Sequence, residues 1–237
     1  MALDRNDLKD SFASVVAHEL RTPITAIRSY AWMALHKSDI PLSEKLEKYL
    51  VRIFLSSERL INLVNNMLHI SSIESGKIEI NIENVDMISI LKDIIDEVYY
   101  SKSTEKNIEI QLLEQSLPKV LADPEKLREV LLNILGNAVK FSPNAGKITV
   151  SFFADGNVVE THIKDQGPGI SKEDLSRLFQ KFGRLDNSYT AAATSGGTGL
   201  GLYISKSLIE LMSGKIWAQS EGVNKGAVFV VSLPIAK

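Results

Sequence analysis

The sequence predicts two structural units, a two-helix hairpin followed by an α/β sandwich, with the boundary near Gly76. Before that glycine, two long segments carry apolar residues every three or four positions, as amphipathic helices do. After it, short alternating segments typical of strands interleave with helical ones. The predicted domains are therefore residues 1–76, the helical hairpin, and residues 77–237, the sandwich.

The first helix is expected from about Leu8 to Lys37, and the second from a Ser43 cap to about Gly76. The second helix has two adjacent apolar stripes: Leu46, Tyr49, Ile53, Leu60, Leu63, Met67 and Ile70, and beside them Leu50, Phe54, Ile61, Val64 and Leu68. One antiparallel neighbour cannot cover both stripes. The sequence therefore predicts a homodimer in which two hairpins form a four-helix bundle.

In the second unit, the pattern predicts strands at 77–82, 108–112, 119–121, 147–153, 158–164, 215–219 and 227–233. Helices are expected at about 86–103, 123–141 and 200–212, and the region from 165 to 199 is expected to be rich in loops. Asp86 and Asp123 cap the first two of these helices, and Pro124 occupies the first turn of the second. Strands interleaved with helices predict an α/β sandwich.

Composition excludes several classes of function. A net charge of −2 argues against a nucleic-acid partner, and the absence of cysteine excludes disulfides, thiolate metal sites and thiol nucleophiles. No apolar run is long enough to span a membrane and no signal peptide is visible, so we expect no membrane contact within this sequence. The abrupt start inside a helical pattern indicates a fragment of a longer protein.

The segment His18-Glu19-Leu20-Arg21-Thr22-Pro23 is the most unusual part of the first helix. His18 and Thr22 share a polar face, and Glu19 is next to the histidine. A zinc-binding His-Glu-x-x-His pattern is not met, because Thr22 stands where the second histidine would be. A lone helical histidine is most often an ordinary surface residue, but Pro23 within the helix favours a functional segment.

Further features in the second unit indicate a nucleotide site. Asn133, Asn137 and Lys140 share one helix face, where amide oxygens suit magnesium and an ammonium suits phosphate; a solvated polar stripe is the alternative. The segment Asp165-Gln-Gly-Pro-Gly169 follows a strand, and its carboxylate could accept a hydrogen bond from an adenine amino group; an ordinary turn is the alternative.

The glycine-rich segment 196–202 leads into a helix, where backbone N–H groups and the helix dipole attract phosphate. It matches neither a dinucleotide-binding fingerprint nor a P-loop. The segment from 183 to 195 before it has few large apolar residues and indicates a mobile lid. Phe179 and Phe182 would anchor the start of this lid, from which Arg184 could reach a terminal phosphate.

These motifs, in this order, resemble the catalytic core of a sensor histidine kinase, the two-component signalling enzyme. His18–Pro23 resembles the phosphoacceptor box of that family, and Leu132–Phe141 its asparagine box. Asp165–Gly169, Leu178–Phe182 and Gly197–Leu202 resemble its first glycine, phenylalanine and second glycine boxes. Each box alone is weak, but all of them in order after a helical hairpin make a specific match.

The resemblance implies a dimerisation and histidine-phosphotransfer hairpin, followed by the ATP-binding sandwich shared with gyrase, mismatch-repair and chaperone ATPases. The implied cofactors are ATP and Mg²⁺. The implied cofactor-binding residues are Asn133, Asn137, Lys140, Phe141, Asp165, Gly167, Gly169, Gly197, Thr198, Gly199, Leu200 and Gly201, with Asn133 and Asn137 as metal ligands.

The resemblance also implies the catalytic roles. His18 would receive the phosphate, Glu19 would act as general base, and Arg184 would stabilise the γ-phosphate. The phosphate would pass to an aspartate of a response-regulator receiver domain, and Thr22 would help to dephosphorylate that regulator. The implied location is cytoplasmic, as the cytosolic portion of a longer sensor protein that can be membrane-anchored. The handedness of the turn near residues 38–42 decides whether phosphorylation occurs within or between subunits.

Two rival functions remain to be weighed. An ATPase of the same fold would carry a water-activating glutamate four residues before Asn137, but this chain has Asn133 there, and an amide cannot act as that base. A nucleotide-binding scaffold without activity is disfavoured by the intact Glu19, Lys140 and Asp165. Thr22 also permits a protein in which phosphatase activity dominates.

Overall fold

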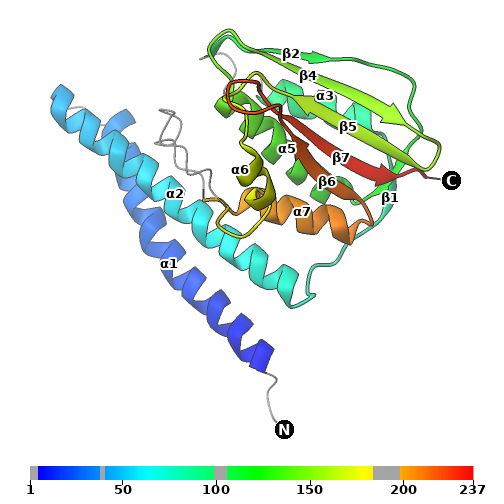
Figure 1. Cartoon of the computed structure of the whole chain (residues 1–237). Helices are drawn as coiled ribbons and strands as arrows, with labels where there is room; N and C mark the ends of the chain where they lie inside the picture. The colour runs from blue at the N-terminus through cyan, green and yellow to red at the C-terminus, as the bar shows by residue number, and fades with distance from the viewer. Residues whose placement is uncertain (1–4, 38–40, 99–105, 184–197, 237) are drawn as a thin grey trace. The chain divides into compact units, whose positions relative to one another are not determined.

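The computed structural model describes residues 5–37, 41–98, 106–183 and 198–236 (Figure 1). They divide into two compact units: the first runs to Ile78 and also includes Thr198, and the second holds the other described residues from Glu79 onward. Within these ranges, no helix combines the length and the apolar character that crossing a membrane requires.

The first unit is a hairpin of two long helices, α1 (Arg5–His36) and α2 (Glu44–Glu74). Ser43 caps α2 as predicted, because its hydroxyl accepts a hydrogen bond from the Leu46 N–H at 3.3 Å. Arg21 donates to the Asn65 side-chain oxygen at 2.7 Å, and Arg28 pairs with Glu58 at 2.8 Å. Between these links the chain advances by seven residues in α1 and returns by seven in α2, so the helices are antiparallel.

The two predicted apolar stripes of α2 differ in their environment. The stripe that includes Val64 is buried or half-buried within the chain. Five members of the other stripe are between 44% and 54% exposed: Leu46, Tyr49, Ile53, Leu60 and Met67. On α1, Leu20 and Ile27 are also exposed. One chain therefore leaves one long apolar stripe of the hairpin uncovered.

The second unit contains a five-stranded mixed sheet in the order β2-β4-β5-β7-β6. Its strands are β2 (Glu109–Leu112), β4 (Lys147–Ala154), β5 (Val158–Lys164), β6 (Lys215–Gln219) and β7 (Val228–Pro234). Only the β2–β4 pairing is parallel. A separate two-stranded antiparallel sheet joins β1 (Glu83–Val85) to β3 (Val120–Ala122).

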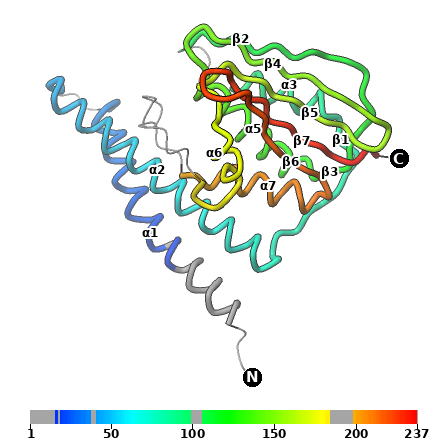
Figure 2. Tube along the Cα trace, in the orientation of Figure 1, coloured from blue at the N-terminus to red at the C-terminus, as the bar shows by residue number. Residues whose placement is uncertain are grey.

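Three helices cover one face of the large sheet, as Figures 1 and 2 show: α3 (Met87–Val98), α5 (Pro124–Phe141) and α7 (Gly201–Leu211). The core lies between these layers and includes alternate strand residues such as Ile148 and Ile163, and Leu131 and Ile134 on the apolar side of α5. All four side chains are completely buried. The predicted α/β sandwich is therefore confirmed, with Asp86 accepting N–H bonds from Ile88 and Ser89 at the start of α3.

The sequence prediction of a strand at 77–82 is wrong. The residues are irregular, and the N–H of Asn81 donates to the Asp123 carboxylate at 2.9 Å instead of entering a ladder. Their alternation arises because Ile78 and Ile80 are half-buried along an extended chain without a partner strand. The prediction also missed a short helix, α6 (Lys172–Arg177), which Ser171 caps. The expected continuation of α3 to residue 103 lies outside the described residues beyond Val98.

Candidate functional site

Helix α5 carries the asparagine box. Asp123 caps it by accepting the N–H groups of Glu125 and Lys126, each at 3.0 Å. On the side away from the core, Asn133, Asn137, Lys140 and Phe141 are all half-buried, while the opposite side is completely enclosed. The Lys140 ammonium lies 5.0 Å from the centroid of the Phe141 ring. The polar face of α5 is therefore partly accessible and rests on a rigid helix.

The start of α7 packs directly against Asn133. The Asn133 Nδ2 donates to the hydroxyl of the buried Ser205 at 2.9 Å. A Cβ atom at Gly201 would come within 2.7 Å of Asn133 Oδ1, so any larger residue there would displace the Asn133 amide from this position. Leu200 is buried just before Gly201. The second glycine box and the asparagine box thus meet at this contact.

Thr198 and Gly199 precede Leu200, and Gly199 has a φ of +71°. Of the predicted site residues, Gly197 and Arg184 lie outside the described residues, as does the expected lid.

The Asp165 carboxylate lies at the end of β5, where it is only 5% exposed. Its Oδ1 accepts N–H bonds from Gly167 at 2.8 Å and from Ala227 at 3.1 Å. Burial raises the pKa of Asp165, although the two N–H donors favour the charged form. A Cβ at Gly167 would lie 3.2 Å from the Phe141 carbonyl oxygen. The Asp165 loop therefore touches the end of α5.

Gly169 has a φ of +69°, and a Cβ there would collide with the carbonyl oxygen of Gly222. Gly222 belongs to the turn that joins β6 to β7, residues 220–227, which the sequence reasoning did not connect with the site. The N–H groups of Asn224 and Gly226 donate to the carbonyls of Pro168 and Gly167. The only sequence signal for this turn is the pair of glycines at 222 and 226, which identifies a turn but not its neighbour.

The phosphoacceptor box lies in the middle of α1, in the first unit. The backbone of His18 is helical, and its side chain is outside the described part of the structure. Glu19 and Thr22 beside it are exposed, and α1 continues through Pro23 to His36. The Arg21–Asn65 hydrogen bond joins α1 to α2 at this level. The box therefore stands on a helix that its hairpin partner holds in register.

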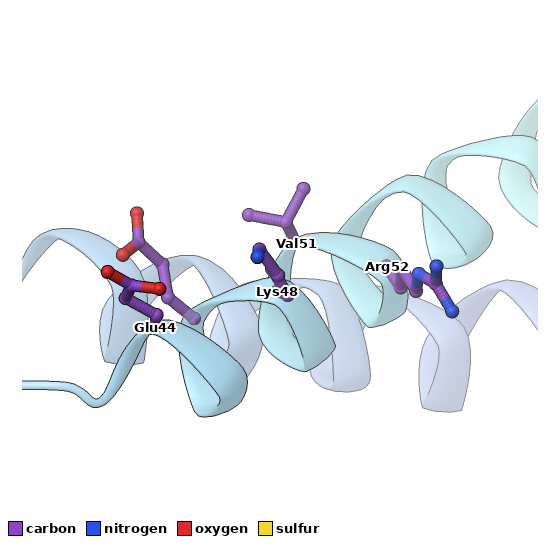
Figure 3. A pocket seen from close by; sticks show the side chains of 5 residues that line it. Glu44, Lys48, Val51 and Arg52 are labelled. Atoms are coloured by element: carbon purple, nitrogen blue, oxygen red, sulfur yellow. The ribbon is translucent and has the colours of Figure 1, made fainter.

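A shallow hollow of about 360 Å³ lies beside the first turns of α2 (Figure 3). Its lining consists of Glu44, Glu47, Lys48, Val51 and Arg52, all of them exposed. None of the predicted site residues is among them, and two acidic and two basic side chains here form an ordinary solvated surface. We therefore do not place the functional site there.

The side chains of the second unit offer oxygen ligands for a metal ion that a nucleotide carries. Within the described ranges, no three His, Asp or Glu side chains gather closely enough to hold a metal ion on their own. Magnesium normally needs only one or two protein oxygens in addition to phosphates and water. The Asn133 amide has its nitrogen engaged by Ser205, which leaves its oxygen as the acceptor. The residues thus fit a magnesium ion that arrives with a nucleotide.

Two family models match this chain, in the order that its motifs indicate. The phosphoacceptor domain of histidine kinases, His Kinase A, matches residues 8–76, and the histidine kinase-, DNA gyrase B- and HSP90-like ATPase matches residues 122–237. The chain belongs to the sensor histidine kinases. Both parts of a sensor histidine kinase catalytic core are therefore present.

Individual proteins and solved structures match along nearly the whole chain. The circadian input-output histidine kinase CikA of Synechococcus elongatus is 33% identical over 99% of this chain and 31% of its own length. The crystal structure of full-length ShkA with AMPPNP superposes with a TM-score of 0.75 at 30% identity, covering 96% of this chain and 46% of ShkA. The structure of ThkA in complex with the response regulator TrrA gives a TM-score of 0.66 at 26% identity, covering 95% of this chain and 61% of the ThkA chain.

This chain spans between 27% and 43% of the length of the curated relatives that it matches.

Proposed function

We propose that this sensor histidine kinase core uses ATP to phosphorylate His18 within a homodimer, and then transfers the phosphate to an aspartate of a response-regulator receiver domain. The observation that carries the proposal is the order of the two family matches, a phosphoacceptor domain at 8–76 and an ATPase domain at 122–237. The ATP analogue bound to ShkA and the response regulator bound to ThkA support the two steps.

We further propose that residues 1–76 form the dimerisation and phosphotransfer domain, and residues 77–237 the catalytic domain. The exposed apolar stripe of α2 supports dimerisation, because a second hairpin would cover it. Large apolar side chains in a continuous stripe are uncommon on a monomer surface. Two hairpins would then form a four-helix bundle.

In the catalytic domain, the Asp165 carboxylate would accept a hydrogen bond from the adenine amino group, and Gly167 and Gly169 would shape that pocket. The Asp165 Oδ1 already accepts two N–H bonds, which orients the carboxylate towards a fixed direction. Asn133 and Asn137 would hold Mg²⁺ through their amide oxygens, with Lys140 on the phosphates and Phe141 beside them. The second glycine box, Gly197–Gly201, would offer backbone N–H groups to the phosphates.

In the transfer step, an imidazole nitrogen of His18 forms a bond to the γ-phosphorus of ATP while the bond to the β-phosphate oxygen breaks and ADP leaves. Glu19 would hold the proton of the other ring nitrogen, which makes the attacking nitrogen more nucleophilic. Arg184 would neutralise charge on the transferred group. The exposed Thr22, one turn from His18, supports a second activity that removes phosphate from the regulator.

The rival function is hydrolysis of ATP without a protein acceptor. A hydrolase of this fold needs a carboxylate at position 133 to activate water. Asn133 has no basic oxygen of that kind, and its amide nitrogen already donates a hydrogen bond to Ser205. The lack of a carboxylate at this position favours the kinase.

The deciding experiment is incubation of the chain with γ-labelled ATP and Mg²⁺, followed by acid and base treatment of the labelled protein. Label that is lost in acid, stable in base and absent from His18→Gln supports the proposal. The matched control is His36→Gln, a change at another histidine of α1, which should keep the label. Full labelling of His18→Gln would reject the acceptor, and released phosphate without labelled protein would favour the ATPase.

A further inference from the structure

The turn at residues 220–227 packs against the Asp165 loop, residues 165–170, although at least 50 positions separate the two in sequence. The Asp165 N–H donates to the Ala227 carbonyl at 2.9 Å, and the Gly226 N–H donates to the Gly167 carbonyl at 3.2 Å. In the other direction, the Ala227 N–H donates to the Asp165 carboxylate. The two loops therefore hold each other by backbone bonds in both directions.

The Ser220 hydroxyl lies at the centre of this contact. It accepts the N–H of Ile170 at 3.0 Å, which ties it to the end of the Asp165 loop. It also accepts the N–H of Gly222 at 3.3 Å and donates to the carbonyl oxygen of Gly226 at 2.7 Å. One half-buried hydroxyl thus joins the beginning of the turn, its end and the neighbouring loop.

The bond to Gly226 reaches Asp165 through a single peptide group. A peptide unit is planar, so the carbonyl of Gly226 and the N–H of Ala227 rotate together. The Ser220 hydroxyl donates to the oxygen of this peptide unit. The N–H of the same unit, on Ala227, donates to Asp165 Oδ1 at 3.1 Å. Gly226 has a φ of +69° and lies so close to the Asp165 carbonyl that a Cβ would collide with it. The Ser220 hydroxyl therefore holds the oxygen end of this peptide plane, and the Asp165 carboxylate accepts from its N–H end.

We propose that Ser220 is a positioning residue for adenine recognition, which orients the Asp165 carboxylate through the Gly226–Ala227 peptide. This inference rests on the proposed function, in which Asp165 accepts a hydrogen bond from the adenine amino group. Two N–H groups fix one oxygen of the Asp165 carboxylate. The other oxygen therefore points in one fixed direction, in which it would accept from the adenine amino group. Without Ser220, the peptide plane can tilt and the carboxylate loses that direction.

The test compares the binding of ATP with that of purine riboside triphosphate, which has hydrogen in place of the 6-amino group, both with Mg²⁺ and by calorimetry. A hydrogen bond to a carboxylate corresponds to roughly a tenfold or larger preference for ATP in the unmodified chain. In Ser220→Ala, affinity for ATP should fall while affinity for the analogue stays the same, so the preference drops below about threefold. Ser220→Thr, which keeps the hydroxyl, should restore the preference.

The ratio separates positioning from a general structural role, because a merely loosened pocket would bind both nucleotides less tightly and keep the preference. The matched control is Ser207→Ala in α7, which removes a similar half-buried hydroxyl bonded to the Tyr203 carbonyl and should change neither affinity. If Ser220→Ala does not fold, Ser220→Cys, with a similar volume and a weak donor, replaces it in the same comparison.

The outcomes also separate this inference from the proposed function. If the unmodified chain binds both nucleotides equally, or if Asp165→Asn retains the preference, the assignment of Asp165 is wrong and the inference falls with it. If Asp165→Asn loses the preference while Ser220→Ala keeps it in full, the role of Asp165 stands and the positioning role of Ser220 is refuted.

Discussion

Substitution of Asp123 tests how helix α5 is held. This carboxylate is only 6% exposed, and it accepts three backbone N–H groups, from Asn81, Glu125 and Lys126. In Asp123→Asn, the amide oxygen can still cap α5, but its NH₂ group would face the Asn81 N–H, so that bond is lost. In Asp123→Ala, the cap is lost as well. The two variants therefore separate the Asn81 contact from the helix cap.

The magnitudes follow from the bonds that are removed. Loss of a hydrogen bond to a charged group costs about 1.5 kcal/mol or more, and loss of an N-cap adds about 1 kcal/mol. For a unit of this size, each kcal/mol lowers the melting temperature by about 2–4 °C. We therefore expect a decrease of roughly 3–6 °C for Asp123→Asn and roughly 5–10 °C for Asp123→Ala.

The same contact predicts a pH dependence. Burial would raise the pKa of Asp123, but the N–H donors of Asn81, Lys126 and Glu125, together with the Lys126 charge, hold it below its ordinary value. A lowered pKa in the folded state means that the stabilisation is fully present above the ordinary value, about 3.9, and is lost as pH falls through the folded value. The difference in the free energy of unfolding between the wild type and Asp123→Asn should be constant near neutral pH and should become smaller in acid.

The assay is thermal unfolding of the full chain between acid and neutral pH, followed by tryptophan fluorescence. The chain has one tryptophan in each unit, Trp32 in α1 and Trp217 in β6, so a Trp32→Phe background reports on the sandwich alone. Asp155→Asn is the control, because Asp155 accepts N–H groups in an exposed turn and should matter little. Equal melting temperatures for the wild type and both Asp123 variants at neutral pH would refute the reasoning.

Two further predictions concern the C-terminal end of α5 and its polar face. Lys106 donates its ammonium hydrogens to the carbonyls of Val139, Lys140 and Ser142, so Lys106→Met should destabilise the sandwich by about 1 kcal/mol and weaken ATP binding. Thermal unfolding and calorimetry check this, with the surface change Lys92→Met as the control; an unchanged melting temperature would contradict it. On the proposed function, Asn137→Asp would place a negative charge beside the phosphates and should weaken Mg²⁺-dependent ATP binding about tenfold or more. Titration with and without Mg²⁺ measures this, and unchanged affinity would remove Asn137 from the site.

The parts of the fold that could be predicted are those with local signals. The start of α5 follows from an aspartate cap and a proline in the first turn, and its buried face follows from the helical period of its apolar residues. The same reasoning failed at 77–82, because alternating isoleucines indicate an extended chain but not whether a strand lies beside it. Helix α6 was missed because its six residues contain no buried side chain to create a period.

The candidate site shows the same limit. The Asp165 loop stands out in the sequence because an acidic residue and two glycines follow a strand. Ser220 and Ala227 do not stand out, since their hydrogen-bond partners, Ile170 and Asp165, lie 50 and 62 positions away. A serine in a glycine-containing turn is ordinary, so only the tertiary structure reveals what its hydroxyl holds.

The two units also differ in how completely one chain can stabilise them. The sandwich has a closed core, in which Leu127, Leu131, Ile148 and Ile163 are all inaccessible to solvent. In α2, by contrast, Leu46, Tyr49, Ile53, Leu60 and Met67 are all exposed, and the buried apolar side chains are Val64 and Ile70. Long helices in water depend on tertiary packing more than on propensity. On the proposed function, the hairpin that carries His18 therefore needs its partner to be stable, whereas the core of the sandwich that carries Asp165 and α5 is closed within one chain.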